Sequence, residues 1–310
     1  MALLISYSGT DPQPWAEAFR AELPELELRL FPEVGDPNEI EFAALWQHPQ
    51  GDLVNYPNLR LILSFGAGVE HIVSDPALPP DIPVVRLVDG AVVHDMALHG
   101  LHWVLHFHRG YHRYAQQQQE RRWQPLAALP PSRRRIGIMG MGQIGQYLAE
   151  QLHRLGFPVT GWGIDPLELD PAIGYRCGSA ELDAFLADTD ILINALPLTE
   201  QTANLIGPEQ LDRLPRGAFI ISESRGGIIN ESALLEALDC GQVEAAALDV
   251  FATEPLPQSS GLWQHPAVFV TPHIGGINYP QTAVKVMAEN IRRVWRGETP
   301  GPLYDPQRGY

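Results

Sequence analysis

The sequence predicts an α/β protein built from two doubly wound domains, each with a parallel sheet. Short β-rich runs alternate with helical patterns along the chain, which is the order expected of parallel strands joined by crossover helices. The chain has 310 residues, more than one domain of the usual ~100–200 residues needs. A glycine-rich turn between a strand and a helix begins only at Gly140, which leaves room for another domain before it.

The expected strands are short apolar runs rich in Val, Ile and Leu, a composition typical of strands buried on both faces. In chain order they are Leu3–Ser6, Leu61–Ser64, Val84–Leu87, Ile136–Met139, Val159–Trp162, Ile191–Ala195, Phe219–Ser222, Ala246–Val250 and Val268–Thr271. A long helical pattern from about Val93 to Gln119 precedes a proline-rich loop. We expect this helix to connect the two domains.

Composition and charge exclude several classes of function. The net charge of -16 would repel phosphate backbones and anionic lipid, so we expect neither a nucleic-acid nor a membrane partner. The first residues turn polar at Ser6 without a basic start, so they predict a strand and not a signal peptide. The only cysteines, Cys177 and Cys240, are too few for a disulfide framework. We therefore expect a cytoplasmic protein.

The glycine turn follows directly after the strand Ile136–Met139 and opens a helix with an apolar face. Gly140 would allow the tight turn, Gly142 the approach of a pyrophosphate, and Gly145 the close packing of helix and strand. This order predicts a Rossmann-like site for NADP or NAD. The residues expected at this cofactor site are Gly140, Met141, Gly142, Gln143, Ile144 and Gly145.

The end of the next strand bears on the choice of cofactor. NAD sites place an acidic residue there, about 20 residues beyond the glycines, to bind the ribose hydroxyls. This chain has Gly163 at that place, and Asp165 follows two positions later. Both are expected near the ribose. The missing acid favours a small preference for NADPH, while Asp165 could still bind the ribose of NADH.

Three charged or titratable residues each follow an apolar strand: Arg225, Glu254 and His273. Because the carboxyl ends of parallel strands line the ligand crevice of a doubly wound sheet, these residues could converge on one site. Taken singly, each has an ordinary explanation as a loop or turn residue. Their joint occurrence in this order favours a catalytic site.

With these segments together, the sequence resembles the D-isomer-specific 2-hydroxyacid dehydrogenases, and among them the shorter bacterial glyoxylate/hydroxypyruvate reductases. The resemblance covers nearly the whole chain. The segments that carry it include Phe65–Val69, the glycine turn, Leu196–Thr202, Ser222–Gly227, Leu248–Pro255, Leu262–Pro266, Thr271–Gly276 and Arg308–Tyr310.

The resemblance implies reduction of a small 2-keto acid to its D-2-hydroxy acid. Arg225 would bind the substrate carboxylate, for which its planar fork of donors is suited. His273 would be the acid/base, with Glu254 favouring its protonated form. Asp249 would bind the nicotinamide carboxamide. Further contacts implied by the resemblance are Ala67, Gly68 and Trp46 for the substrate, and Pro197 and Thr202 for the cofactor.

The chain departs from the family pattern beside the arginine. Ser222 stands where asparagine is common, and Glu223 follows where a small or apolar residue is usual. We expect activity to be retained with altered support around Arg225. The remaining histidines, including His99 and His102, lack the carboxylate or cysteine partners of a metal site, so no metal is expected.

The predicted substrate domain comprises residues 1–98 and 279–310, and the nucleotide domain, residues 99–278, is inserted into it. The family and the helical segment near residues 93–125 suggest a homodimer. Two other functions stay open. One is an NAD(H)-sensing corepressor of the same fold, and the other is a dehydrogenase for an inorganic anion or a bulkier keto acid. The sequence does not rank closely related keto acids or fix the physiological direction.

Overall fold

The computed structural model describes residues 1–9 and 11–309. Tyr310, the last residue of the terminal segment that carries the resemblance, lies outside the described residues. The chain forms two compact units. Unit 1 consists of Met1–Val92 and Asn278–Tyr310, and unit 2, Val93–Ile277, is inserted between these segments.

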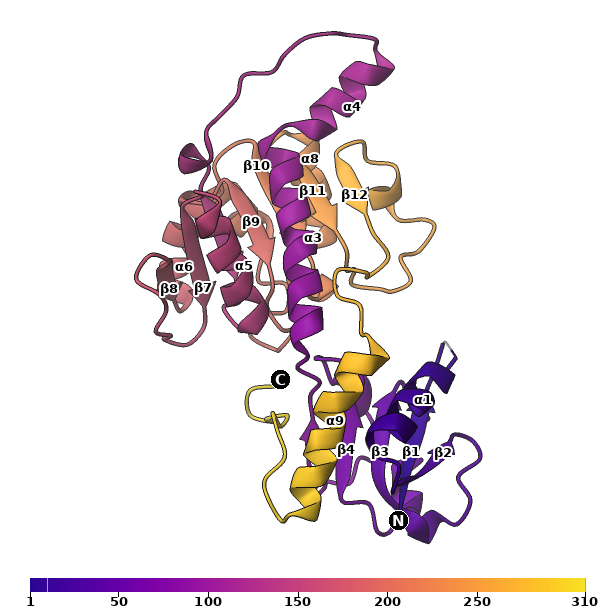
Figure 1. The fold of residues 1–310 in the computed structure, drawn as a ribbon. Helices are drawn as coiled ribbons and strands as arrows, with labels where there is room; N and C mark the ends of the chain where they lie inside the picture. The colour runs from indigo at the N-terminus through magenta and orange to yellow at the C-terminus, as the bar shows by residue number, and fades with distance from the viewer. Residues whose placement is uncertain (10, 310) are drawn as a thin grey trace. The chain divides into compact units, whose positions relative to one another are not determined.

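Unit 1 contains a five-stranded sheet in the order β2-β1-β3-β4-β5, in which all pairs are parallel. Its strands are β1 (Ala2–Tyr7), β2 (Glu27–Leu30), β3 (Ile40–Trp46), β4 (Leu61–Ser64) and β5 (Val84–Val85). Its helices are α1 (Gln13–Glu22), α2 (Glu70–Val73) and α9 (Pro280–Trp295). Leu3 and Ile5 on β1 pack with α1 and α9 on one face, and Leu4 faces the other core. The unit is therefore covered on both faces (Figure 1).

Unit 2 contains a seven-stranded parallel sheet in the order β12-β11-β10-β9-β6-β7-β8. The strands are β6 (Ile136–Met139), β7 (Val159–Gly163), β8 (Gly174–Cys177), β9 (Ile191–Asn194), β10 (Ala218–Ser222), β11 (Val243–Leu248) and β12 (Val268–Val270). The helices are α3 (Gly90–His108, which begins in unit 1), α4 (Tyr111–Gln119), α5 (Gln143–Arg154), α6 (Ser179–Ala187), α7 (Pro208–Arg213) and α8 (Glu231–Asp239). Short 3₁₀ helices occur at Pro37–Glu39, Leu53–Asn55, Pro131–Arg133, Gly226–Ile228 and Gly261–Trp263.

Alternate residues of the seven-stranded sheet enter two separate cores. Ile136 and Ile138 of β6 pack with residues of α3 and α5, whereas Met139 packs on the side of α6, α7 and α8. The chain winds outward from β6 in both directions, so β6 and β9 flank the point where the strand order reverses. In such sheets ligands bind beyond the carboxyl ends of the strands at this point. The doubly wound α/β fold is thereby confirmed.

The structure differs from the expected elements in two respects. Three strands were not expected, β2, β3 and β8. The continuous helix expected from Val93 to Gln119 is wrong, because it divides into α3 and α4 at Arg109 and Gly110. Gly110 has a φ of +66°, a left-handed conformation that interrupts an α-helix and that glycine adopts without strain. Across residues 1–9 and 11–309, the structure contains no helix with the length and apolar character needed to cross a membrane.

Candidate active site

The loops after β10, β11 and β12 carry Arg225, Glu254 and His273. These strands are neighbours in the sheet and all run parallel, so their carboxyl ends lie along one edge. The three side chains expected to share a site are therefore placed on three adjacent loops of unit 2.

His273 and Glu254 form a hydrogen-bonded pair. Nδ1 of His273 lies 2.7 Å from Oε2 of Glu254, and Oε1 of Glu254 accepts a hydrogen bond of 2.9 Å from the Phe251 amide. Burial raises the pKa of the Glu254 carboxyl, but the bonds from His273 and Phe251, together with the charges of His273 and Arg225, lower it below its usual value. Glu254 is therefore ionised at neutral pH and can accept a hydrogen bond from Nδ1 of His273.

Arg225 is partly buried and lies close enough to the same pair for its charge to act on Glu254. Its Nη1 donates a hydrogen bond of 2.7 Å to the carbonyl of Ser224. A guanidinium presents five N–H donors in a planar fork, a geometry that matches a carboxylate. The structure thus brings a guanidinium cation and an acid–histidine pair together.

Asp249 is completely buried and holds the loop that carries His273. Its Oδ1 accepts hydrogen bonds from Thr271 Oγ1 at 2.6 Å and from the Ile274 amide at 2.8 Å, and Oδ2 accepts from the Gly275 amide at 2.7 Å. Its own carbonyl accepts from the amide of His273 at 2.9 Å. These bonds keep His273 in the left-handed conformation, with a φ of +54°. The nicotinamide contact expected of Asp249 stays a prediction.

The glycine turn has the shape that a dinucleotide phosphate requires. A β-carbon on Gly140, whose φ is +95°, would lie 2.6 Å from the carbonyl oxygen of Ala195, and one on Gly145 would lie 2.0 Å from that of Gly140. By contrast, a β-carbon on Gly142 would meet no atom within 4 Å. Gly142 is the N-cap residue of α5 and makes no side-chain cap, so the open space lies at the N-terminus of this helix. These residues fit an NAD(P) pyrophosphate.

The other expected cofactor residues lie around this turn. Gln143 and Ile144 begin α5, whereas the side chain of Met141 is buried in the core beside Gly161. In the loop after β9, Oγ1 of Thr202 donates a hydrogen bond of 2.6 Å to the Pro197 carbonyl. Pro197 and Thr202 thus shape one loop beside the switch point. Their contact with a cofactor stays a prediction.

Tyr175 lies beside Gly163, the position at which an NAD site would carry an acidic residue for the ribose hydroxyls. A β-carbon on Gly163 would lie 2.5 Å from the hydroxyl of Tyr175 on β8. That hydroxyl donates a hydrogen bond of 2.6 Å to the main-chain oxygen of Asp165, whose side chain is exposed. The Tyr175 hydroxyl would therefore have to shift to admit any side chain at position 163.

In unit 1, the residues expected to touch substrate lie together. The Trp46 ring stands against Gly66, where a β-carbon would lie 2.7 Å from Cζ3 of the tryptophan. The adjoining loop is braced by Arg86, whose Nε donates a hydrogen bond of 3.0 Å to the carbonyl of Ala67. Ser64 Oγ donates to the carbonyl of Gly68 at 3.2 Å. Substrate contacts of Trp46, Ala67 and Gly68 stay predictions.

Two residues in the loops of unit 2 have structural roles that the sequence did not reveal. Thr271 binds Asp249, and no sequence signal singled it out. Glu223 is fully buried and bonded to His99, which was given no role. The one sequence signal for Glu223 was that it stands where the family usually has a small or apolar residue.

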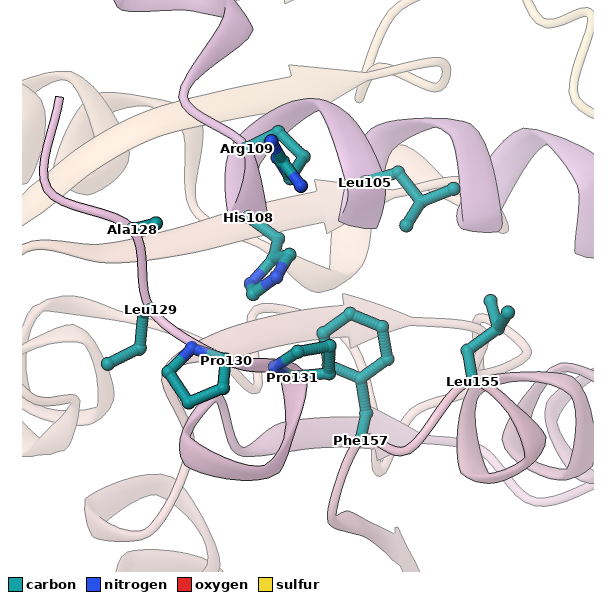
Figure 2. Close-up of a pocket in the computed structure, with 9 residues that line it drawn as sticks. All are labelled: Leu105, His108, Arg109, Ala128, Leu129, Pro130, Pro131, Leu155 and Phe157. Atoms are coloured by element: carbon teal, nitrogen blue, oxygen red, sulfur yellow. The ribbon is translucent and has the colours of Figure 1, made fainter. Parts of the chain in front are cut away.

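Unit 2 has a cavity away from the loops that carry Arg225, Glu254 and His273, and Figure 2 shows the residues that line it. Its lining residues are Leu105, His108, Arg109, Ala128, Leu129, Pro130, Pro131, Leu155 and Phe157. Pro131 precedes β6 and Phe157 precedes β7, so this cavity is at the amino ends of the parallel strands, opposite the edge that carries Arg225.

The family model described as D-isomer specific 2-hydroxyacid dehydrogenase, NAD binding domain, matches residues 101–275. Glyoxylate/hydroxypyruvate reductase A from Serratia proteamaculans (strain 568) is 34% identical over 315 residues, covering 100% of both chains.

Solved structures give the same result over the full length. A D-isomer specific 2-hydroxyacid dehydrogenase from Xanthobacter autotrophicus Py2, in complex with NADPH and MES, is 38% identical with a TM-score of 0.96, covering 100% of this chain and 99% of that one. An NADPH-dependent glyoxylate/hydroxypyruvate reductase from Sinorhizobium meliloti, in complex with NADP and sulfate, is 30% identical with a TM-score of 0.94, covering 100% of both. The chain therefore belongs to the D-isomer specific 2-hydroxyacid dehydrogenase family.

Proposed function

We propose that this protein reduces a small 2-keto acid, of the glyoxylate and hydroxypyruvate class, to the D-2-hydroxy acid with NAD(P)H. The observation that carries the proposal is the His273–Glu254 pair, 2.7 Å apart, with the charge of Arg225 acting on the same carboxylate. In this proposal unit 2 is the nucleotide domain and unit 1 the substrate domain. The reducing cytoplasm is the proposed location.

Each of the three residues has one task in the reaction. Arg225 binds the substrate carboxylate through two parallel hydrogen bonds and orients the adjacent 2-oxo group. The bound cofactor supplies a hydride to C2. Negative charge then develops on the 2-oxo oxygen, and His273 stabilises this charge and donates its proton there. Glu254 keeps His273 protonated and correctly oriented before the transfer.

We assign cofactor binding to the glycine turn, the loop of Pro197 and Thr202, and Asp249. The 2′ position of the ribose would face Gly163 and Asp165. With no carboxylate at position 163 to repel a 2′-phosphate, the proposed preference is for NADPH, as in the complexes of the two relatives. The preference is small, because residues 163–165 contain no cation to bind that phosphate. Trp46, Ala67 and Gly68 are proposed as the substrate contacts of unit 1.

The test is a panel of NADPH and NADH oxidation rates with glyoxylate, hydroxypyruvate and pyruvate, together with NADP+ and NAD+ reduction rates with phosphite, all followed at the absorbance of the reduced nicotinamide. We expect turnover of the first two acids and a modestly higher kcat/KM with NADPH. Arg225→Lys keeps the charge but not the fork, and should lose at least about tenfold in kcat/KM, the equivalent of one charged hydrogen bond. Tight NAD(H) binding without turnover would instead support an NAD(H)-sensing protein. Oxidation of phosphite would support a dehydrogenase that acts on an inorganic anion.

A further inference from the structure

Glu223 is a buried carboxyl that the proposed reaction does not use. It lies two residues before Arg225, directly after β10, and its side chain is completely shielded from solvent. Its amide donates a hydrogen bond of 3.3 Å to the carbonyl of Asn194, at the end of the neighbouring strand β9. A carboxyl at this depth is costly to bury, so its partners indicate what it does.

The partner of Glu223 is His99, on α3. Nδ1 of His99 lies 3.1 Å from Oε2 of Glu223, and Nε2 of the same ring lies 3.1 Å from the indole nitrogen of Trp103. An indole nitrogen can only donate a hydrogen bond, so Nε2 of His99 must accept one and carries no proton. Nδ1 is therefore the nitrogen of His99 that donates a hydrogen bond to Glu223.

The carboxyl is held on one side only. Oε1 of Glu223 is buried and has no hydrogen-bond partner among the described residues. Room for it comes from Gly100 on α3, where a β-carbon would lie 3.2 Å from each carboxyl oxygen. Burial and the charge of Asp249 raise the pKa of Glu223, and the opposing effect of His99 is smaller. The carboxyl is anchored to α3 by the one hydrogen bond with His99.

The same histidine also lies against the loop of the catalytic acid/base. A β-carbon on Gly275 would lie 3.4 Å from Nδ1 of His99 and 3.0 Å from Oδ2 of Asp249. Gly275 is two residues after His273, and its amide is bound by Asp249. His99 thus bonds to Glu223 in the loop of Arg225 and lies beside Gly275 in the loop of His273.

We propose that Glu223 is a positioning residue of the reaction. Its hydrogen bond with His99 fixes the Arg225 loop against α3 and keeps the His99 ring in place against the His273 loop. The inference rests on the proposed function, because it assigns Glu223 the task of orienting the substrate-binding arginine and the acid/base. Neither Glu223 nor His99 needs to touch substrate for this task.

The test compares two substitutions of Glu223 with a matched pair elsewhere in unit 2. Glu223→Gln keeps an oxygen that can accept from His99 and carries no charge, whereas Glu223→Leu leaves the His99 donor unpaired. Glu244 provides the control, because it lies 2.8 Å from Nε2 of His112 and follows Val243 at the amino end of β11, away from the catalytic edge. Glu244→Gln and Glu244→Leu disturb an acid–histidine pair, and the bonds of the same carboxylate with Arg113, without disturbing the site.

We expect Glu223→Leu to raise KM for the keto acid and lower kcat, so that kcat/KM falls roughly tenfold or more, as expected for one unpaired buried donor. KM for NADPH should stay within about twofold, and Glu223→Gln should restore most of the activity. Neither Glu244 variant should change kcat/KM by more than about twofold. A Gln variant as impaired as the Leu variant, or equal effects at Glu244, would overturn the proposal.

Amide hydrogen exchange on the same proteins, without substrate, gives a readout that does not depend on turnover. Glu223→Leu should accelerate exchange at residues 224–227 and 273–276, and Glu244→Leu should not. If the wild type reduces no keto acid, the proposed function fails. Amide hydrogen exchange at the two loops still tests whether Glu223 holds them in place. Should Glu223→Leu not fold, His99→Ala removes the same bond from α3 and carries the same expectation. Unchanged exchange in both loops contradicts the proposal.

Discussion

At the scale of single residues, the account depends on the pairing of His273 with Glu254. The carboxylate holds Nδ1 of the ring at 2.7 Å, so Nε2 is the nitrogen left to exchange a proton with substrate. The lowered pKa of Glu254 keeps this residue charged over the pH range in which a histidine titrates. The same lowered pKa means that the pair stabilises the fold above about pH 4.3, and that this stability is lost as the pH falls through the lower value in the folded protein.

Glu254→Gln tests this pairing through the pH profile of keto-acid reduction. Reduction needs protonated His273, so kcat/KM should fall as the pH rises and the ring loses its proton. An amide stabilises the imidazolium less than a carboxylate does, so the fall should occur at lower pH in the variant. The measurement is kcat/KM between pH 5 and pH 9 for both proteins. An identical profile in the two proteins would show that Glu254 is not the partner of His273.

The charged trio could be predicted because each member follows a strand within a recognisable segment. The bond between His99 and Glu223 could not, because 124 residues separate the two and only folding brings α3 against the end of β10. Gly163 was singled out as an unusual residue, but its proximity to Tyr175 on another strand could not be predicted. Sequence patterns indicate which residues are unusual, whereas their partners depend on the three-dimensional packing.

At the scale of elements, the unexpected strands share a physical cause. β2 and β8 are edge strands of four residues with charged side chains, so they lack the continuous apolar pattern of a central strand. β3 is central, but its run Ile-Glu-Phe-Ala-Ala-Leu-Trp includes alanine, leucine and glutamate, which also favour helices. The central strands rich in Val, Ile and Leu were predicted with boundaries close to those observed.

Two alanine substitutions in the turn between β6 and α5 should have different effects, one on stability and the other on cofactor binding. Gly145→Ala places a β-carbon 2.0 Å from the carbonyl oxygen of Gly140 and should lower the free energy of unfolding by ~1–3 kcal/mol or more. Gly142→Ala meets no atom and has an ordinary φ of -73°, so the cost to stability should stay within about 1 kcal/mol.

Gly142→Ala should nevertheless weaken NADPH binding about tenfold or more, because its methyl group would stand where the pyrophosphate approaches the backbone. Chemical denaturation measures the first effect, and titration of nicotinamide fluorescence the second. Equal losses of stability in the two variants, or unchanged NADPH affinity in Gly142→Ala, would argue against this use of the glycines.

At the scale of the whole molecule, each unit has its own parallel sheet and its own pair of cores. Alternation of strands and helices was enough to predict this architecture. The segment that follows α3 was less predictable, since the helix breaks at Gly110 and α4 extends away from the seven-stranded sheet (Figure 1). This segment exposes aromatic side chains, including Tyr111 and Trp123, and Trp123 is 99% exposed.

We predict that this exposed segment, Tyr111–Pro125, joins two copies of the chain as a homodimer, because a fully exposed tryptophan gains most from burial in an interface. Sedimentation velocity of the wild type should give twice the mass of one chain, and Trp123→Ser should shift the population toward the monomer. Trp263→Ser provides the control, since Trp263 is also exposed but lies beside β12. A monomeric wild type, or equal dissociation in both variants, would contradict the assignment.

The most direct test of the central claim is chiral analysis of the product formed from hydroxypyruvate and NADPH by the wild-type protein. We predict one equivalent of D-glycerate for each equivalent of NADPH oxidised, because His273, Glu254 and Arg225 bind and protonate the substrate in one fixed orientation. Formation of L-glycerate or of a racemic mixture, or the absence of NADPH oxidation in a folded protein, would contradict the account.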